Sequence, residues 1–345
     1  MCHIGVVVLN YNKKELLERC LLSLFDLEYE NFDIIVVDNG SSDGSIDLVR
    51  KKFEKVFLVE VGYNSGFCKG NNLGIKKAFS LGCDAVVILN NDTVVDSFFL
   101  RGVMLSFNNS EKIGMISTNI RLLDSPQIID ANGFLITPDG LGKNLNAGKA
   151  KEFGDFQQEV FCPTGAATFY SKELLEDIKQ DGEYFDEDFE FCYEELDLGW
   201  RARLKGWKCL FAPKAIVYHK KSGTGGAYSD FFAYYSSRNI TFNIIKNYPS
   251  FFYVARAFLL AFLRDVFLFL GIFFGKGVGK KVKDKNGGGK LVKIFLSSHI
   301  DAMKKIRRMF EKRSYIQKNK KVTRLEVKRW FKELGIPFFD SIYKI

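Results

Sequence analysis

The sequence of 345 residues lacks the patterns that identify several large classes of protein. Its seven cysteines are odd in number, none stands in a C-x-x-C pair, and several lie inside apolar runs. This is typical of buried, reduced thiols in a reducing compartment and argues against a disulfide framework or a zinc site. The glycine-rich segment 64–74 has neither the G-x-G-x-x-G spacing nor the G-K-[ST] ending, so neither the dinucleotide fingerprint nor the P-loop applies.

The amino-terminus has no basic region followed by a long apolar run, so we expect no secretory signal. Residues 251–274 are long enough to cross a bilayer, which takes about 20 residues. Arg256, Arg264 and Asp265 interrupt this stretch, and each would cost about 2.5–3.5 kcal/mol near the membrane centre. We therefore favour a hydrophobic helix that lies in the membrane plane over a helix that crosses the bilayer. A buried core helix and a dimer surface are the alternatives.

Charge is unevenly divided along the chain. Residues 1–250 carry 27 Lys and Arg against 34 Asp and Glu, whereas residues 251–345 carry 23 against 7. A basic, glycine-rich linker is predicted at 276–290, followed by basic amphipathic helices at 291–334. The basic tail at 251–345 is expected to bind a polyanion, either anionic lipid or nucleic acid. Solvated basic helices without a partner are the alternative.

Strand-like and helix-like segments alternate through the first part of the chain, which predicts an α/β domain. A mostly parallel sheet with helices on both faces follows from this order, within a catalytic domain at 1–245 and a helical region at 246–345. Strands are expected at 4–9, 33–37, 56–61, 85–89, 208–211 and 215–219, with looser short strands between 113 and 170. Helices are expected at 13–25, 45–53, 72–81 and 197–205.

Polar loops follow the first four strands, at 10–12, 38–44, 62–66 and 90–92. The carboxyl ends of parallel strands share one edge of a sheet, so these loops should form one ligand site. Asp38 is suited to accept a hydrogen bond from a uracil or thymine N3–H or from a ribose hydroxyl, or else it caps an ordinary turn. Asp92 is suited to bind Mg²⁺ or Mn²⁺, with a helix N-cap as the commoner role for a lone aspartate.

Two further segments carry candidate chemistry. Seven carboxylates fall between Asp186 and Asp197 among aromatic residues, and crowding of this kind should raise at least one pKa, as a general base requires. A solvated acidic loop is the alternative, which the interleaved phenylalanines disfavour.

His219 precedes the basic, glycine-rich residues 220–226, a composition suited to a loop that closes over a diphosphate. A lone histidine is more often structural. The glycines of 64–74 allow close backbone approach to a ligand.

Taken in order, these segments resemble glycosyltransferase family 2, which has the GT-A fold, and especially its rhamnosyltransferase-like members. The resemblance covers about two thirds of the chain and rests on VVLNYN at 7–12, VVDNGSSDG at 36–44, NSGFCKGNNLG at 64–74, LNND at 89–92, GA at 165–166, EELDL at 194–198 and residues 213–219.

The resemblance implies a role for each matching position. The donor would be bound by Tyr11, Asp38, Asn39, Asn64, Gly66 and Asn91, and the metal, Mg²⁺ or Mn²⁺, by Asp92 and His219. Glu195 would be the catalytic base, with Glu194 and Asp197 as possible substitutes. Two positions depart from the family pattern: Asn90 replaces the first aspartate of D-x-D, and Glu195 stands where an aspartate base is expected.

The function that the resemblance implies is metal-dependent, inverting transfer of a sugar, rhamnose or another hexose, in cell-surface polysaccharide synthesis. The donor would be a dTDP- or UDP-sugar and the acceptor a glycan or polyprenyl-linked glycan. With the basic tail, the expected location is the cytoplasmic face of the plasma membrane, held peripherally, with no nucleic acid as partner. A nucleotidyltransferase that makes nucleotide-sugars is one alternative. A non-enzymatic protein that binds membrane or nucleic acid is the other.

Overall fold

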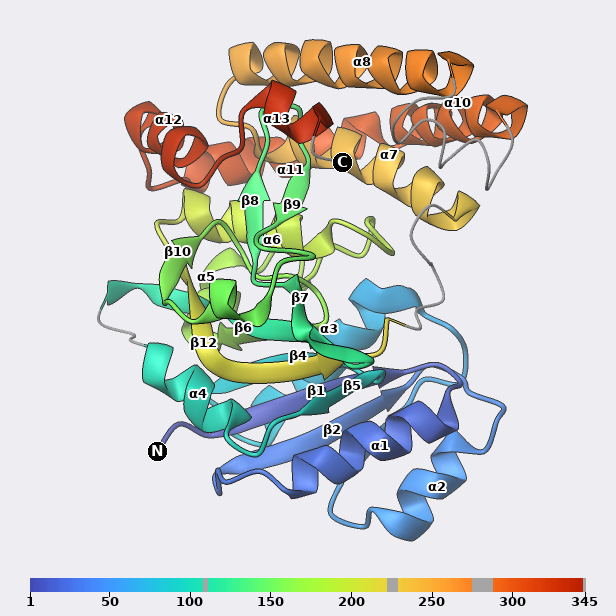
Figure 1. Cartoon of the computed structure of the whole chain (residues 1–345), viewed down its shortest axis with the longest axis vertical. Helices are drawn as coiled ribbons and strands as arrows, with labels where there is room; N and C mark the ends of the chain where they lie inside the picture. Colours follow the sequence, from blue (N-terminus) through green and yellow to red (C-terminus); the bar gives the residue numbers. More distant parts are fainter. Residues whose placement is uncertain (108–110, 222–228, 275–287, 344–345) are drawn as a thin grey trace. The chain divides into compact units, whose positions relative to one another are not determined.

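The computed structural model describes residues 1–107, 111–221, 229–274 and 288–343 (Figure 1). Its chain divides into two compact units. Unit 1 comprises residues 1–134 and 144–222, and unit 2 comprises residues 135–143 and 223–345. The glycine-rich loop after His219 lies almost wholly outside the described residues, as does the predicted linker except for 288–290.

Unit 1 is built on a ten-stranded sheet whose first four strands are parallel. Their order in the sheet is β3-β2-β1-β4, so the first strand of the chain lies between the second and the fourth. Short apolar runs become buried strands here because helices cover both faces. This part of the sequence prediction is confirmed. The bounds are β1 Ile4–Asn10, β2 Phe32–Asp38, β3 Phe57–Glu60 and β4 Ala85–Asn90.

The rest of the sheet mixes directions. Strand β11 (Ala167–Ser171) lies antiparallel between β4 and β6 (Ile113–Leu122), and β12 (Lys208–His219) runs parallel to β6. The prediction of two strands at 208–211 and 215–219 is wrong, because β12 continues through both. Its register shifts between Ala212 and Ile216, around Pro213, which has no N–H to donate. Short strands complete the sheet: β5 Thr93–Val95, β7 Ser125–Ala131 and β10 Gln158–Val160.

The two faces of the parallel strands are covered by different helices. Val6 and Val8 of β1 share a core with Leu17 and Leu21 of α1, since alternate residues of a strand point to the same face. The opposite face of β1 and β2 is covered by α3 (Figure 1). The helices of unit 1 are α1 Lys14–Phe25, α2 Ser45–Lys52, α3 Gly66–Ser80, α4 Phe99–Ser106, α5 Lys172–Ile178 and α6 Glu194–Leu204.

Helix α3 begins at Gly66, six residues before the predicted start at 72, because polar residues conceal its first turns. Two of its glycines fix its distance from the sheet. A methyl group at Gly70 would overlap Leu9, and one at Gly74 would overlap Val7. The sequence interpretation of these glycines as a place for ligand approach is therefore wrong for Gly70 and Gly74, which serve helix–sheet packing.

Unit 2 is helical apart from a short hairpin formed by strands β8 and β9. Arg313 donates hydrogen bonds to the carbonyl oxygens of Ile245 (2.7 Å) and Tyr248 (2.6 Å) and so joins α11 to the end of α7. The predicted helices at 251–274 and 291–334 are confirmed. The elements are β8 Phe134–Ile136, β9 Gly142–Asn144, α7 Asp230–Asn247, α8 Phe251–Phe274, α10 Gly288–Lys304, α11 Ile306–Asn319, α12 Arg324–Glu333 and α13 Phe338–Tyr343.

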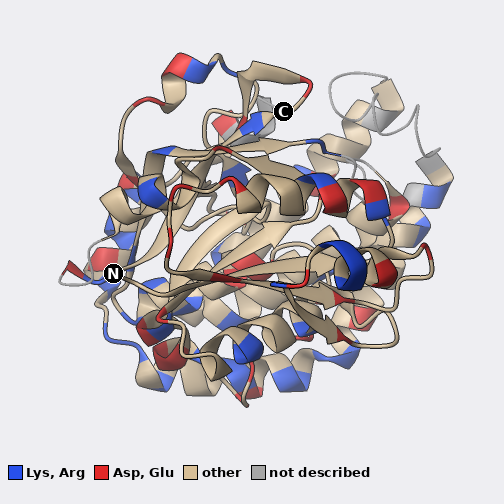
Figure 2. Cartoon of the chain, turned by 90° about the horizontal axis from the view of Figure 1, so that it is seen from below, with Lys and Arg blue, Asp and Glu red and all other residues tan. Residues whose placement is uncertain are grey.

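Charged residues lie mostly on helices and loops, and the strands of the sheet contain few of them (Figure 2). Among the described residues, no helix combines the length and the hydropathy that a bilayer span requires.

Candidate active site

Polar side chains at the carboxyl ends of β1, β2 and β4 are joined by hydrogen bonds. Register places Asn10 opposite Asp38 and Leu9 opposite Asn90. The Asn10 amide nitrogen donates to Asp38 Oδ2 (3.1 Å), and Asn10 Oδ1 accepts from the Asn91 amide (2.7 Å). Asn10 thus connects three of the four predicted loops. Sequence reasoning placed its loop correctly but gave Asn10 itself no role, because its partners are distant in sequence.

Asp38 and Asn39 shape the loop after β2. Asp38 is 1% exposed, and its Oδ1 accepts from the backbone N–H groups of Gly40 (3.0 Å) and Ser41 (2.8 Å). Asn39 is also buried, donates to the carbonyl oxygen of Gly66 (3.0 Å) and accepts from the Ser65 hydroxyl (2.7 Å). Asp38 therefore holds the turn of the loop, and Asn39 holds the loop against the start of α3.

The other predicted donor-binding residues offer more surface. Tyr11 is 41% exposed, Asn64 is exposed, and Asn91 is half-buried. Asn64 also accepts from the Gly66 N–H (3.1 Å), where Gly66 has a φ of 80°. A left-handed conformation of this kind favours glycine. Tyr11, Asn64 and Asn91 are therefore the members of the predicted set best placed to touch a ligand.

Asp92 and His219 lie together on the same edge of the sheet, because His219 pairs with Thr93 where β12 meets β5. His219 Nε2 is 3.2 Å from Asp92 Oδ1, and its Nδ1 is 2.8 Å from Asp130 Oδ2. Burial acts to lower the pKa of His219, but hydrogen bonds and charge from Asp130 and Asp92 raise the pKa to about 9. Asp130 also pairs with Lys221 (2.5 Å).

This arrangement fits a divalent cation. Adjacent ligands of an octahedral Mg²⁺ lie about 3.0 Å apart, given metal–oxygen distances of about 2.1 Å. The 3.2 Å between His219 Nε2 and Asp92 Oδ1 is close to that separation. Asp130 holds the other ring nitrogen, as carboxylates commonly do behind metal-binding histidines. Asp130 was missed from the sequence, since nothing near the end of β7 distinguishes it.

Replacing Asp130 by asparagine tests this supporting contact. We expect Asp130→Asn to weaken Mn²⁺ binding about 10–100-fold, because the outer partner fixes the orientation of the histidine ring. Isothermal titration of Mn²⁺ in the presence of a nucleoside diphosphate measures the effect. Unchanged affinity would show that Asp130 has no part in orienting His219.

Glu195 stands in the first turn of α6, buried beside Gly165. A methyl group at Gly165 would overlap the Glu195 carboxylate, and the carbonyl oxygen of Ala166 accepts from the N–H of Asn90 (2.9 Å). Glu195 therefore lies next to the segment that pairs with Asn90, the last residue of β4. Asn90 is two residues before Asp92. Burial raises the pKa of Glu195 to about 7. Near neutral pH a substantial fraction of this carboxyl group is therefore ionised, as a general base requires.

The two alternative bases differ in their surroundings. Glu194 is buried, and its pKa is raised strongly, first by burial and then by the charge of Glu195. Asp197 is fully buried and forms an ion pair with Arg201 (2.9 Å). Arg201 also donates to the carbonyl oxygens of Ile178 and Tyr184. Asp197 therefore helps to hold α6 in place, and its charge is committed to that pair.

The backbone before Glu194 is unusual. Glu190, Cys192 and Tyr193 adopt φ values of 61°, 68° and 65°, a left-handed region that non-glycine residues rarely occupy. The segment is held over α3, because Asn72 exchanges hydrogen bonds with the Phe185 backbone (2.8 and 2.9 Å). Strain of this kind gathers at functional sites. Only the crowding of carboxylates signalled this segment in the sequence.

A substitution at Gly165 tests the position of Glu195. Gly165→Ala should lower turnover about 100-fold, since a catalytic group displaced by about 1 Å loses that much. Steady-state kinetics measure the effect, with thermal melting to show that the fold survives. Gly289→Ala is the control, because an added methyl group there meets nothing within 4 Å. Normal turnover in a folded Gly165→Ala protein would mean that Glu195 does not act from this position.

The sheet and this edge define an α/β domain with an acidic, polar site at the carboxyl ends of its parallel strands. The sequence profile of glycosyl transferase family 2 matches residues 5–179, about half of the chain, and the chain belongs to this family.

Curated relatives agree with that assignment. The chain is 26% identical over 216 residues to the poly-β-1,6-N-acetyl-D-glucosamine synthase of Staphylococcus aureus strain COL. The aligned region covers 60% of this chain and 47% of the synthase. The Staphylococcus epidermidis synthase is 25% identical over the same length. The chain spans about half the length of these relatives.

Solved structures share the fold. S. aureus TarS residues 1–349, in complex with UDP-GlcNAc, aligns with a TM-score of 0.52 at 18% identity, covering 92% of this chain and 90% of that one. Mannosyltransferase PcManGT from Pyrobaculum calidifontis, in complex with GDP-Man and Mn²⁺, aligns with a TM-score of 0.50 at 16% identity, covering 96% and 88%. These likenesses support the GT-A fold, and the rhamnosyltransferase-like subtype stays a prediction.

Proposed function

We propose that this chain is an inverting, metal-dependent glycosyltransferase that uses a nucleoside-diphosphate sugar in polysaccharide synthesis. One observation carries the proposal: a buried carboxyl group with a pKa near neutrality, Glu195, is tied to the same strand end as the Asp92–His219 pair. Membership of glycosyl transferase family 2 supports it. So do the names of the relatives, among them a polysaccharide synthase and proteins crystallised with UDP-GlcNAc or with GDP-Man and Mn²⁺.

Asp92 and His219 would hold the divalent cation, Mg²⁺ or Mn²⁺, and Asp130 would orient His219 behind it. When bound, such a cation neutralises the charge of the diphosphate leaving group. Tyr11, Asn64 and Asn91 contact the donor, while Asp38 and Asn39 keep the nucleotide loop in shape.

Glu195 accepts the proton of the acceptor hydroxyl in this mechanism. The hydroxyl oxygen forms a bond to the anomeric carbon while the bond from that carbon to the diphosphate oxygen breaks on the opposite face. A single displacement of this kind inverts the anomeric configuration. Burial supplies the raised pKa that lets a carboxylate act as base near neutral pH.

The donor and acceptor are proposed by class. The donor is proposed to be a UDP- or dTDP-sugar carrying rhamnose or another hexose, a class supported by the likeness to TarS, which was crystallised with UDP-GlcNAc. The acceptor is proposed to be a glycan or polyprenyl-linked glycan. Thermal stabilisation by UDP-, dTDP- and GDP-sugars with Mn²⁺ ranks the donors, and transfer of a labelled sugar to lipid extract tests the reaction. Release of pyrophosphate from a nucleoside triphosphate and a sugar phosphate, without sugar transfer, would instead establish a nucleotidyltransferase.

We further propose that unit 2 attaches the enzyme peripherally to the anionic, cytoplasmic face of the plasma membrane. Two of the three charges that interrupt the apolar segment are held in ion pairs: Arg264 pairs with the buried Asp139 (2.7 Å) and with Asp265 (3.2 Å), while Arg256 is exposed. Along the other side of α8, large apolar residues are exposed, including Leu259 (59%) and Phe262 (65%). An amphipathic helix of this kind, in a strongly basic region, suits an interfacial position.

Vesicle binding tests the attachment. The double variant Leu259→Asp with Phe262→Asp should lose most sedimentation with phosphatidylglycerol vesicles, because two charges would have to enter the acyl boundary. Phe156→Asp, at an exposed apolar residue of unit 1, is the matched control and should sediment normally. Equal sedimentation of all three proteins would contradict a role for α8.

A further inference from the structure

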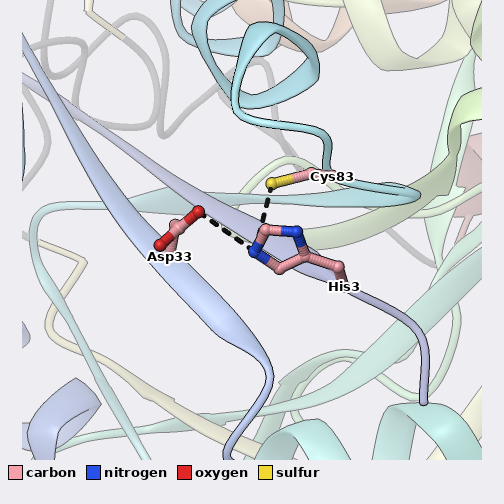
Figure 3. A group of neighbouring side chains, drawn as sticks. All are labelled: His3, Asp33 and Cys83. Carbon is pink, nitrogen blue, oxygen red and sulfur yellow. Dashed lines mark hydrogen bonds and ion pairs between the residues drawn. The ribbon is translucent and has the colours of Figure 1, made fainter.

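A second cluster of ligating side chains lies at the opposite edge of the sheet, at the amino ends of the parallel strands. His3 directly precedes β1, Asp33 is the second residue of β2, and Cys83 lies two residues before β4. One potential ligand atom from each lies within 4.8 Å of the other two. Figure 3 shows that one imidazole nitrogen of His3 faces both the Asp33 carboxylate and the Cys83 thiol. The seven residues of β1, at about 3.3 Å each, put roughly 20 Å between this cluster and the active site.

The distances suit a tetrahedral cation of the zinc class. His3 Nε2 is 3.0 Å from Asp33 Oδ2 and 3.8 Å from Cys83 Sγ. Ligand atoms around zinc lie about 3.3–3.6 Å apart, given bonds of about 2.0–2.3 Å. The two distances from His3 fall on either side of that range, so small side-chain rotations bring both of them to it, and the Asp33 and Cys83 ligand atoms lie within 4.8 Å of each other.

The backbone fixes these three residues before any cation binds. The His3 carbonyl oxygen accepts from the N–H of Asp84 (2.7 Å), and the His3 N–H donates to Asp84 Oδ2 (2.9 Å). Strand pairing sets Gly5 opposite Asp33, and the Cys83 N–H donates to the Ala78 carbonyl oxygen (3.2 Å). The backbone conformation of these three segments, which are far apart in the sequence, is therefore already fixed, so binding a cation would cost little further conformational entropy.

Hydrogen bonding alone satisfies this trio poorly. A single ring nitrogen, Nε2, faces both the carboxylate and the thiol, and one N–H reaches only one of them well. A cation among the three atoms would satisfy all of them. The His3 and Asp33 side chains are 25% and 27% exposed, which gives an ion a way in, while the Cys83 thiol is buried behind them.

We propose that His3, Asp33 and Cys83 form a structural site for a divalent cation of the zinc class, distinct from the catalytic cation. On binding, the Cys83 S–H bond breaks, its proton passes to solvent, and a metal–sulfur bond forms. Neutral His3 and ionised Asp33 complete three protein ligands, and a water molecule takes the open fourth position. The site joins the start of β1 to β2 and β4. The proposal reverses the sequence-based expectation of no zinc site, which rested on the absence of a C-x-x-C pair; these ligands are separated by tens of residues.

Cobalt titration of the full-length, metal-free protein tests the site. One equivalent of Co²⁺ should give a thiolate-to-cobalt charge-transfer band, and Zn²⁺ should abolish that band. Cys83→Ser should remove the band, whereas Asp92→Ala, at the active site, should keep it. The absence of a charge-transfer band in the wild type, or its persistence in Cys83→Ser, would overturn the proposal.

A second measurement covers the chance that Cys83→Ser fails to fold. His3→Gln changes a partly exposed ligand, and its melting temperature should not respond to Zn²⁺. The wild-type melting temperature should rise by about 5 °C at zinc concentrations well above the dissociation constant. An equal rise in His3→Gln would place the stabilising zinc elsewhere.

Discussion

Replacing Glu195 by glutamine should lower turnover by about 10²–10⁴-fold, the contribution expected of a general base. Glutamine keeps the size of the side chain beside Gly165 but has no carboxylate to accept the acceptor's proton. Donor affinity should remain unchanged, since Glu195 acts on the acceptor. Glu194→Gln is the matched control at the neighbouring buried carboxyl, and it should keep turnover within about tenfold of wild type. Near-normal turnover in Glu195→Gln would remove Glu195 from the role.

The pH dependence of the wild type follows from the same group. Burial holds the pKa of Glu195 at about 7, so the basic form accumulates as the pH rises through 7. The ratio kcat/KM should therefore increase from pH 5.5 through 7 and level off above about pH 8. A profile that is flat across this range would contradict the assignment.

Stability should change in the opposite direction. The folded pKa of Glu195 lies above its unfolded value of 4.5, so ionisation destabilises the fold as the pH rises through 7. Glutamine avoids that cost, which is on the order of 3 kcal/mol at most. Glu195→Gln should therefore melt at a higher temperature than wild type at pH 8 and at a similar temperature at pH 5.

Replacing Asp92 by alanine should abolish the stimulation of donor binding by Mn²⁺. Asp92 supplies one of two protein ligands, and the remaining His219 cannot hold a hard cation on its own. Calorimetric titration of UDP with and without Mn²⁺ should show a large metal effect in wild type and none in Asp92→Ala. Asp124→Ala removes an exposed carboxylate that pairs with Lys220 (2.7 Å) and serves as the control. Unchanged metal-dependent affinity in Asp92→Ala would refute the metal assignment.

The sequence predicted most of the parallel half of the sheet, because its strands are short apolar runs with a polar loop after each. The runs at 4–9 and 85–89 became β1 and β4 almost to the residue. Strand β11 lies antiparallel between β4 and β6, a direction that local pattern does not encode. Strand direction depends on pairing between distant segments, which a single sequence does not reveal.

The sequence places several residues of the candidate site at one edge of the sheet, but it does not reveal the contacts between them. Asp92, His219 and Glu195 stood out as polar residues at strand or helix ends. Asn10 and Asp130 did not, because their importance lies in partners 81 and 89 residues away. Sequence reasoning also left Asp197 open as a base, and only the structure pairs it with Arg201. Pairing of this kind is a property of packing and leaves no local pattern.

Anomalous diffraction at the manganese edge, from crystals grown with UDP and Mn²⁺, tests the central claim most directly. We expect a manganese peak bound by Asp92 Oδ1 and His219 Nε2, with diphosphate oxygens as further ligands and the Glu195 carboxylate facing the same site. A nucleotide-bound manganese ion held by other residues, with Asp92 and His219 still paired to each other, would contradict the account.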